Sequence, residues 1–309
     1  MNSAFTIRPV KPVDLPLIND WARNEGFAPG TGDIGIYRQT DRQGIWTGCL
    51  EEEPIGCIAG IRYNHAYGFI GLYIVRPDQR GRGYGVKLWR EALEHLSDVS
   101  CVGLEAAENR IDDYSNWGFQ PASTTTRWQL ELDSLPHQIR ALERPRGLRL
   151  IHGNDIPELK VQIYDADREL NPRPHFLSDW LHHPAGDVTA LIDSKQDCHG
   201  FARIRPCLLK NEAGWRIGPL LADSPELAEL LIMDLLSARQ GLVIMDSPGG
   251  NALAAPLLQK LGFKAVGRTL RMYRGVMPSR QLDEVYGLCL LYTSPSPRDK
   301  RQSRMPAWA

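Results

Sequence analysis

A run of glycines and arginines is the strongest chemical signal in the 309-residue sequence. Gln79-Arg80-Gly81-Arg82-Gly83-Tyr84-Gly85 stands between an apolar, strand-like segment, Phe69–Val75, and an amphipathic helical segment, Val86–Leu96. Glycines let several backbone N–H groups turn toward one ligand, and the helix that follows directs its unpaired N–H groups and positive dipole end to the same place. The pattern predicts a phosphate or pyrophosphate site, to which Arg80 and Arg82 add positive charge.

The glycine spacing alone leaves more than one interpretation open. A plain turn between a strand and a helix uses the same backbone freedom without binding a ligand. A Walker A loop is excluded, because no Gly-Lys-Ser/Thr follows the glycines. A dinucleotide-binding fold places its glycines after the first strand, whereas four predicted strands precede this run.

Two motifs, in this order, resemble those of the Gcn5-related N-acetyltransferase (GNAT) superfamily. The segment Val75–Gly85 matches the family pattern Gln/Arg-x-x-Gly-x-Gly/Ala after a strand that ends in Val-x-Pro. Tyr114-Ser115-Asn116-Trp117-Gly118-Phe119 matches the tyrosine that the family places four residues before Gly-Phe. The resemblance covers residues 4–132 clearly and 148–288 more weakly. It is similar to the two-domain bacterial members with a degenerate second copy.

The resemblance implies acetyl-CoA as the co-substrate, with no metal. In the family, one strand splays from its neighbour and offers backbone groups to the pantetheine arm. The residues expected to do so here are Tyr73, Ile74 and Val75. The residues expected to hold the pyrophosphate are Arg80, Gly81, Arg82, Gly83, Tyr84 and Gly85. Asn109 is expected to touch the arm, although it precedes Tyr114 by five residues where seven are usual in the family.

Acetyl transfer to an amine requires a polarised carbonyl, an acid for the leaving thiolate and a base for the amine. Tyr114 is the expected acid, as in the family, and the Val75 N–H is the expected donor to the carbonyl. A packing role for Tyr114 is the alternative. Glu105 is the preferred base, with Glu25, Glu108 or a chain of waters as alternatives.

A loop after the first predicted helix is expected to face the acceptor. Related two-domain proteins share a pattern like Trp21-Ala22-x-x-Glu25-Gly26-Phe27, which makes Glu25 and Phe27 candidate substrate-binding residues. A structural turn is the alternative. In the second half, Tyr164–Arg168 and Arg173–Trp180 mix aromatic and charged residues. They close the acceptor pocket across the domain interface in one interpretation and form an ordinary helix pair in the other.

The order of predicted elements indicates two copies of one α/β unit. Length alone favours two domains. Asp14-Leu15-Pro16 is echoed by Asp155-Ile156-Pro157, and Trp117-Gly118-Phe119 by Leu261-Gly262-Phe263, at nearly one offset. The predicted fold is therefore two tandem GNAT-like domains, each a mixed twisted sheet flanked by helices. The first sheet ends in a strand over Thr124–Leu132.

The expected organisation follows from these matches and from composition. We predict a GNAT domain over 1–134, a linker over 135–147, a degenerate GNAT-like domain over 148–288, and a tail over 289–309. The tail resembles translated sequencing-adapter sequence and is left out of the functional interpretation; a genuine basic tail is the alternative. The second domain lacks the glycine cradle, so one acetyl-CoA per chain is expected.

Composition limits the class of protein and the kinds of partner that remain possible. A hydrophobic fraction of 42% and a charged fraction of 24% are ordinary for a globular protein, and a net charge of −1 favours neither nucleic acid nor a membrane surface as partner. The sequence shows neither a secretory signal nor an apolar run long enough for a membrane helix, so a cytoplasmic protein is expected. The six cysteines show no metal-ligand spacing and are predicted to be buried thiols.

The predicted function is N-acetyl transfer from acetyl-CoA to a primary amine of a small molecule or protein. A non-catalytic acyl-CoA-binding or regulatory protein is the main alternative, and a nucleotide-binding enzyme with the same cradle is another. The sequence leaves the acceptor and the oligomeric state undetermined.

Overall fold

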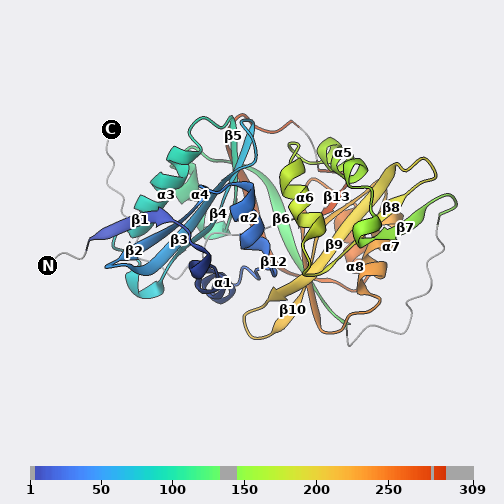
Figure 1. Ribbon diagram of the computed structural model, residues 1–309, viewed down its shortest axis with the longest axis horizontal. Coiled ribbons are helices and arrows are strands. Elements are labelled where there is room, and N and C mark those ends of the chain that lie inside the picture. Colours follow the sequence, from blue (N-terminus) through green and yellow to red (C-terminus); the bar gives the residue numbers. More distant parts are fainter. Residues whose placement is uncertain (1–3, 133–144, 280–281, 290–309) are drawn as a thin grey trace.

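The computed structural model of the chain describes residues 4–132, 145–279 and 282–289. Figure 1 shows the two halves of the chain side by side, the first in blue to teal and the second in yellow-green to orange. Long central strands from both halves cross between them. The predicted linker and tail lie mostly outside the described residues, so the domain boundaries remain predictions.

The first half alternates strands with two pairs of helices. Its strands are β1 (Phe5–Pro9), β2 (Ile45–Leu50), β3 (Glu53–Arg62), β4 (Tyr67–Val75), β5 (Cys101–Ala106) and β6 (Gln120–Glu131). Its helices are α1 (Leu15–Asn24), α2 (Asp33–Thr40), α3 (Tyr84–His95) and α4 (Ile111–Ser115). Leu72 and Ile74 pack in one core with residues of α1 and α2, while Ile70 packs with residues of α3 and α4. The two helix pairs therefore cover opposite faces of the sheet.

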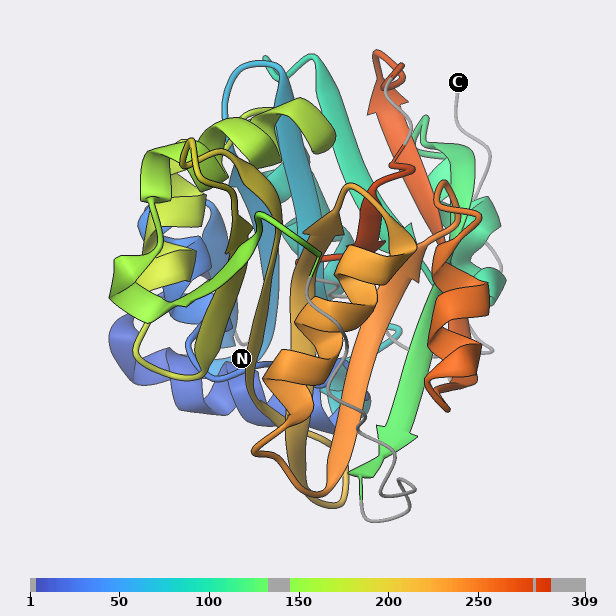
Figure 2. The same ribbon diagram turned by 90° about the vertical axis from the view of Figure 1, so that its right-hand side faces the viewer.

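The second half repeats this order of elements. Its strands are β7 (Arg149–His152), β8 (Asp187–Ile192), β9 (Cys198–Leu208), β10 (Ala213–Ala222), β11 (Leu242–Pro248), β12 (Lys264–Gly275) and β13 (Val285–Gly287). Its helices are α5 (Glu158–Arg168), α6 (Pro174–His182), α7 (Pro225–Leu236) and α8 (Ala254–Lys260). Figure 2, which looks onto this half, shows α5 and α6 on one side of its strands and α7 and α8 on the other.

The two halves exchange their last long strands. Within the described residues, the strands form one sheet in the order β1-β2-β3-β4-β5-β12-β6-β11-β10-β9-β8-β7, and β13 pairs with β10. β12 of the second half therefore lies antiparallel between β5 and β6 of the first, and β6 pairs with β11 of the second. The sequence pattern predicts β6 as a strand but does not specify its neighbours, because period and propensity report burial and not pairing.

A buried ion pair fixes each exchanged strand. Arg271 on β12 lies directly opposite Glu105 on β5 and pairs with its carboxylate. Arg127 on β6 lies directly opposite Asp246 on β11, with the Arg127 Nε atom 2.8 Å from Oδ1. The two arginines are 144 residues apart and the two acids 141, so these pairs are equivalent in the two copies.

The interface between the halves is part of the protein core. Tyr37 of α2 packs 6.2 Å, between ring centroids, from Phe176 of α6. Asp33, at the start of α2, and Arg205, on β9, are fully buried and lie 2.6 Å apart. A buried ion pair that loses one partner costs about 3–5 kcal/mol, so such pairs link the folding of the two halves.

Two further searches cover only the described part of the chain. None of its helices combines the length and the apolarity that a membrane crossing requires. None of its groups of histidine, cysteine and carboxylate side chains is arranged to hold a metal ion.

Candidate functional site

A gap opens in the sheet between β4 and β5. The two strands are parallel and paired from Tyr67 with Cys101 to Ile70 with Leu104, where the pairing ends. Leu72 has a φ of +49°, and the pairing of β4 with β3 shifts register nearby. The bulge turns the rest of β4 away from β5. The expected splay is therefore present at the predicted place.

The backbone of β4 alternates between this gap and β3. The Arg76 N–H donates to the Ile55 carbonyl on the β3 side. Because successive residues of a strand direct their backbone groups to opposite sides, Val75 and Tyr73 direct theirs to the gap, and Ile74 directs its own to β3. Two of the three predicted pantetheine contacts thus face the gap with their backbone groups.

The glycine run forms an open cradle at the end of β4. Gly81 and Gly83 have φ angles of +76° and +82°, which favour glycine, and Gly83 immediately precedes α3. A Cβ atom added at either residue would meet no heavy atom of the described chain within 4 Å. The space that glycine leaves open is therefore available to a ligand. Gly85 is different, because a Cβ there would lie 2.5 Å from the Tyr73 hydroxyl.

The two cradle arginines differ in what they do. Arg82 is exposed beside the glycines, as a phosphate-binding side chain would be. Arg80 turns back, and its guanidinium donates to the Val75 carbonyl at 2.7 Å and to Glu25 at 2.5 Å. The Arg80 side chain therefore links the end of β4 to the loop after α1 and does not extend into the cradle. This position differs from the phosphate contact expected for Arg80.

Tyr114 lies on the face of the sheet that α3 and α4 cover. It is 2% exposed, and its ring centroid is 5.1 Å from that of Trp89 on α3. Burial, with a contribution from the nearby Tyr114, raises the pKa of the Tyr73 phenol well above its usual range. Tyr73 packs against the same core as Tyr114, so both residues lie on this face of the sheet. Asn109 is exposed in a short 3-10 helix, Glu108–Arg110, directly after β5.

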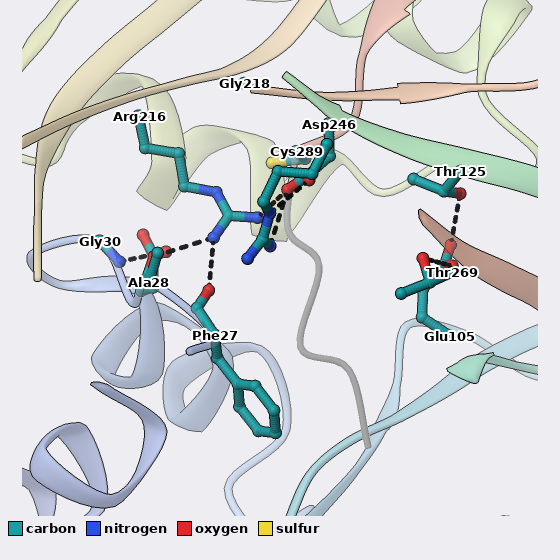
Figure 3. Close-up of polar contacts among 12 residues, drawn as sticks. Phe27, Ala28, Gly30, Glu105, Thr125, Arg216, Gly218, Asp246, Thr269 and Cys289 are labelled. Carbon is teal, nitrogen blue, oxygen red and sulfur yellow. Dashed lines mark hydrogen bonds and ion pairs between the residues drawn. The ribbon is translucent and has the colours of Figure 1, made fainter. Parts of the chain in front are cut away.

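The carboxylate of Glu105, the predicted base, is held by neighbouring side chains. Its side chain is fully buried, and its carboxylate accepts hydrogen bonds from Thr125 at 3.0 Å, from Thr269 at 2.8 Å and from Arg271. Figure 3 shows Thr125 and Thr269 converging on this carboxylate from the two exchanged strands. A carboxylate held by three donors, one of them a guanidinium, is poorly placed to take a proton from an amine. These contacts favour a structural role for Glu105 over its predicted role as base.

The predicted acceptor loop divides into two parts. Glu25 is half-buried and bound to Arg80, which places it beside the cradle. The Phe27 side chain is 1% exposed and belongs to the core between the halves, so its predicted contact with substrate does not fit this arrangement. Its carbonyl and that of Ala28 accept hydrogen bonds from Arg216 of the second half, at 3.0 and 2.9 Å (Figure 3).

The second half closes its equivalent gap with its own chain. β10 and β11 are paired only from Trp215 with Val243 to Ile217 with Met245. Beyond that point β13 pairs with β10, and the Leu288 N–H donates to the Asp246 carbonyl of β11. β13 thus fills the space that corresponds to the gap beside β4. The short segment Val285–Gly287 gives too little periodic pattern for this pairing to be predicted.

Asn251 and Asp223 also distinguish the filled gap of the second half from the open gap of the first. Asn251, at the family's usual distance before Gly262-Phe263, donates to the Val285 carbonyl of β13 at 3.3 Å. Asp223, at the end of the strand that corresponds to β4, accepts hydrogen bonds from Tyr164, Arg168 and His199. A carboxylate therefore stands where the first half has its cradle.

Comparisons with known proteins agree with this geometry. Residues 15–119 match the acetyltransferase (GNAT) family and residues 161–287 match an acetyltransferase (GNAT) domain. A holothin acyltransferase of Pseudoalteromonas sp. (strain SANK 73390) is 28% identical over 292 residues, 94% of this chain and 95% of the relative.

Solved structures show the same fold along nearly the whole chain. A Pyrococcus horikoshii protein assigned as an acetyltransferase has a TM-score of 0.73 at 23% identity, covering 94% of this chain and 96% of that one. A tandem GNAT protein from the clavulanic acid biosynthesis pathway has a TM-score of 0.63 at 15% identity, covering 89% and 100%. They confirm the predicted α/β architecture. The chain therefore belongs to the GNAT superfamily of acyltransferases and carries two GNAT domains in tandem.

Proposed function

We propose that the first half transfers an acetyl group from acetyl-CoA to a primary amine of a small molecule or protein. The observation that carries this proposal is the open glycine cradle, Gly81–Gly83, at the mouth of the gap beside β4. Exposed backbone N–H groups at the start of α3 suit a pyrophosphate, and an unpaired strand edge suits an amide-bearing arm. The relative named for acylation of holothin supports acyl transfer as the reaction.

Three residues of the first half have roles in this proposal. The Val75 N–H polarises the thioester carbonyl from the gap. The amine nitrogen forms a bond to the carbonyl carbon, the carbon–sulfur bond breaks, and the Tyr114 hydroxyl gives its proton to the departing thiolate. Arg80 holds the end of β4 and the Glu25 loop in register.

The amine must also lose a proton. Glu105 is engaged by Thr125, Thr269 and Arg271, and Glu25 is bound to Arg80. Of the routes left open by the sequence, Glu108 and water remain, and we assign this proton to water, which also returns a proton to the Tyr114 phenolate.

We further propose one acetyl-CoA per chain, bound by residues 73–85. The second half contributes structure: β12 completes the sheet beside β5, and Arg216 holds the acceptor loop. In its own gap β13 takes the place of a pantetheine arm.

Thiol release and calorimetry together test the function. Acetyl-CoA should bind, NAD should not, and an amine panel should release free CoA thiol in the presence of the enzyme. Tight binding of acetyl-CoA with no thiol release from any amine would favour the non-catalytic, acyl-CoA-binding alternative.

A further inference from the structure

Three fully buried arginines lie side by side in the core where the two halves meet. Arg203 and Arg205 are two residues apart on β9, so their side chains share one face of the sheet, and Arg216 lies directly opposite Arg205 on β10. Arginine is almost never fully buried unless it is paired, and like charges opposite each other destabilise a sheet. Each of these guanidinium groups therefore needs a compensating partner.

Two of the three arginines have a carboxylate partner. Arg205 pairs with Asp33 of the first half at 2.6 Å, and Arg216 pairs with Asp246 at 2.6 Å. Asp246 is also the partner of Arg127 on β6. The three buried arginines and the one on β6 thus bring four guanidinium groups to two buried carboxylates. This cluster carries a net charge of +2 when all of these groups are ionised.

Arg203 is the arginine that has no carboxylate. Within the described residues, its guanidinium forms no ion pair, and its Nε and Nη1 atoms have no hydrogen-bond acceptor. Only its Nη2 atom is engaged, by a hydrogen bond of 2.5 Å to the Ala185 carbonyl. Burial and the neighbouring Arg205 lower the pKa of Arg203 to about 10, so the side chain is still charged at neutral pH.

The aromatic ring beside Arg203 does not supply the missing negative charge. The Arg203 guanidinium lies 4.7 Å from the centroid of the Trp180 ring on α6, and the Arg205 guanidinium lies 4.4 Å from the same centroid. A ring face attracts a cation but carries no net charge. Trp180 is itself fully buried, and its Nε1–H group has no acceptor in the part of the chain that the structure describes. Buried N–H groups without acceptors and an excess of positive charge thus occur together.

We propose that a small monovalent anion of the halide class, with chloride as the expected ion, binds between the halves on the guanidinium of Arg203. The full burial of Arg203 and Trp180 limits the ligand to a compact ion. Guanidinium N–H groups form strong hydrogen bonds to an anion. Water could also accept these hydrogen bonds, but it would leave the buried charge uncompensated. This site does not depend on the proposed acetyl transfer.

The proposed anion would strengthen the contact of the first half with the second. A Cβ atom added at Gly30 would lie 2.3 Å from the Arg205 Nε atom. One added at Gly32 would lie 2.1 Å from the Nε2 atom of His183, so the loop before α2 packs directly on this cluster. Burial and the charge of Arg203 lower the pKa of His183, as expected beside an excess of positive charge. A ligand that binds only the folded state should stabilise this arrangement.

Thermal unfolding of the full-length protein tests the site. The protein is placed in sodium gluconate, whose anion is too large for a buried site, and chloride then replaces gluconate at constant ionic strength. Arg203→Met removes the charge and keeps a long apolar side chain. Arg239→Met is the matched control, because Arg239 also lies 4.7 Å from a tryptophan ring, that of Trp215, but pairs with Asp187. A crystal soaked in sodium bromide locates the ion by anomalous scattering.

The melting temperature of the unsubstituted protein should rise with chloride, by about 3 °C or more at ten times the Kd. Bromide should have the same effect and should give an anomalous peak beside the Arg203 guanidinium. Arg203→Met should lose the halide dependence, and Arg239→Met should retain it. In gluconate, Arg203→Met should unfold at the same temperature as the unsubstituted protein or above it, because the variant buries no unpaired charge.

Three results would overturn the site. The first is an equal melting temperature in chloride and in gluconate for the unsubstituted protein. The second is full halide dependence in a folded Arg203→Met variant. The third is a bromide peak beside Arg203 with no stabilisation by halide in solution, which would identify an adventitious ion only. The first and third results need no variant, so they decide the matter even if Arg203→Met does not fold.

Discussion

Gly83 is the residue on which the cofactor assignment depends most directly. It combines a φ of +82°, open space at its Cα and a place at the first turn of α3. Each feature has an ordinary structural explanation, but together they leave backbone N–H groups accessible where a helix begins. Arg80, two residues before Arg82 in sequence, serves the same site indirectly by bridging Val75 and Glu25.

Gly83→Val should weaken CoA binding at least tenfold, about 1.4 kcal/mol. The branched side chain occupies the space left for the ligand, and it strains a backbone with positive φ. Gly147→Val is the matched control, because Gly147 has a φ of +89° and open space far along the chain from the cradle. Calorimetry of both variants separates the ligand contact from the strain. Equal CoA affinity in both folded variants would refute the contact.

Tyr114→Phe should lower kcat about 100-fold while the Kd of acetyl-CoA changes less than threefold. The substitution keeps the ring against Trp89 and removes only the hydroxyl group. Steady-state thiol release and calorimetry give the two quantities. A kcat within twofold of the unsubstituted enzyme would show that water protonates the thiolate and that Tyr114 is a packing residue.

At the scale of elements, the exchanged strands decide how the halves depend on each other. Thr125 and Thr269 lie directly opposite each other where β6 and β12 pair, and both hydroxyls donate hydrogen bonds to the Glu105 carboxylate. The equivalent ion pairs on β5 and β11 tie each half to the last strand of the other. An acid that looked catalytic in the sequence is thereby explained as a structural partner.

Glu105→Gln should therefore lower the free energy of unfolding and leave kcat nearly unchanged. Loss of the charge leaves the buried Arg271 guanidinium without its carboxylate, and breaking a buried pair costs about 3–5 kcal/mol. Urea unfolding should show that loss, and kcat at a temperature where the variant is folded should stay within threefold. Asp246→Asn, in the equivalent pair, should destabilise by a similar amount. A 100-fold fall in kcat with normal stability would restore Glu105 as the base.

Features that depend on neighbouring residues in the chain could be predicted from the sequence, and features that depend on distant contacts could not. The cradle and Tyr114 lie in short contiguous motifs, whose conformation depends on the residues themselves. Arg271 is 166 residues from Glu105, and strand patterns do not name a partner at that distance. The pairing of β13 with β10 likewise joins segments that lie far apart within the second half. The sequence therefore indicates the cofactor site and leaves the acceptor undetermined.

At the scale of the whole molecule, the chain is one sheet with two non-equivalent gaps. The gap beside β4 stays open next to a glycine cradle, while the gap beside β10 is filled by β13. Buried contacts such as Asp33 with Arg205 join the halves. Under the proposed function, the first half carries the cofactor chemistry and the second half supports it.

Cutting the chain within the predicted linker tests this interdependence. Residues 1–138 and 139–309, produced together, should copurify as a 1:1 complex that retains acetyl-CoA binding, because β6 and β12 are exchanged. Each piece alone should be poorly soluble, since it exposes an apolar interface. Size-exclusion chromatography with light scattering gives the stoichiometry. A monomeric, fully folded 1–138 piece with unchanged acetyl-CoA affinity would show that the exchange is dispensable.

The stoichiometry of acetyl-CoA binding to the full-length protein tests the central claim most directly. Calorimetric titration of the intact chain, repeated with Gly83→Val, reports both the number of sites and their location. The account predicts one acetyl-CoA per chain, with the affinity of that single site falling at least tenfold in the variant. Two equivalent sites per chain, or one site that Gly83→Val leaves unchanged, would contradict it.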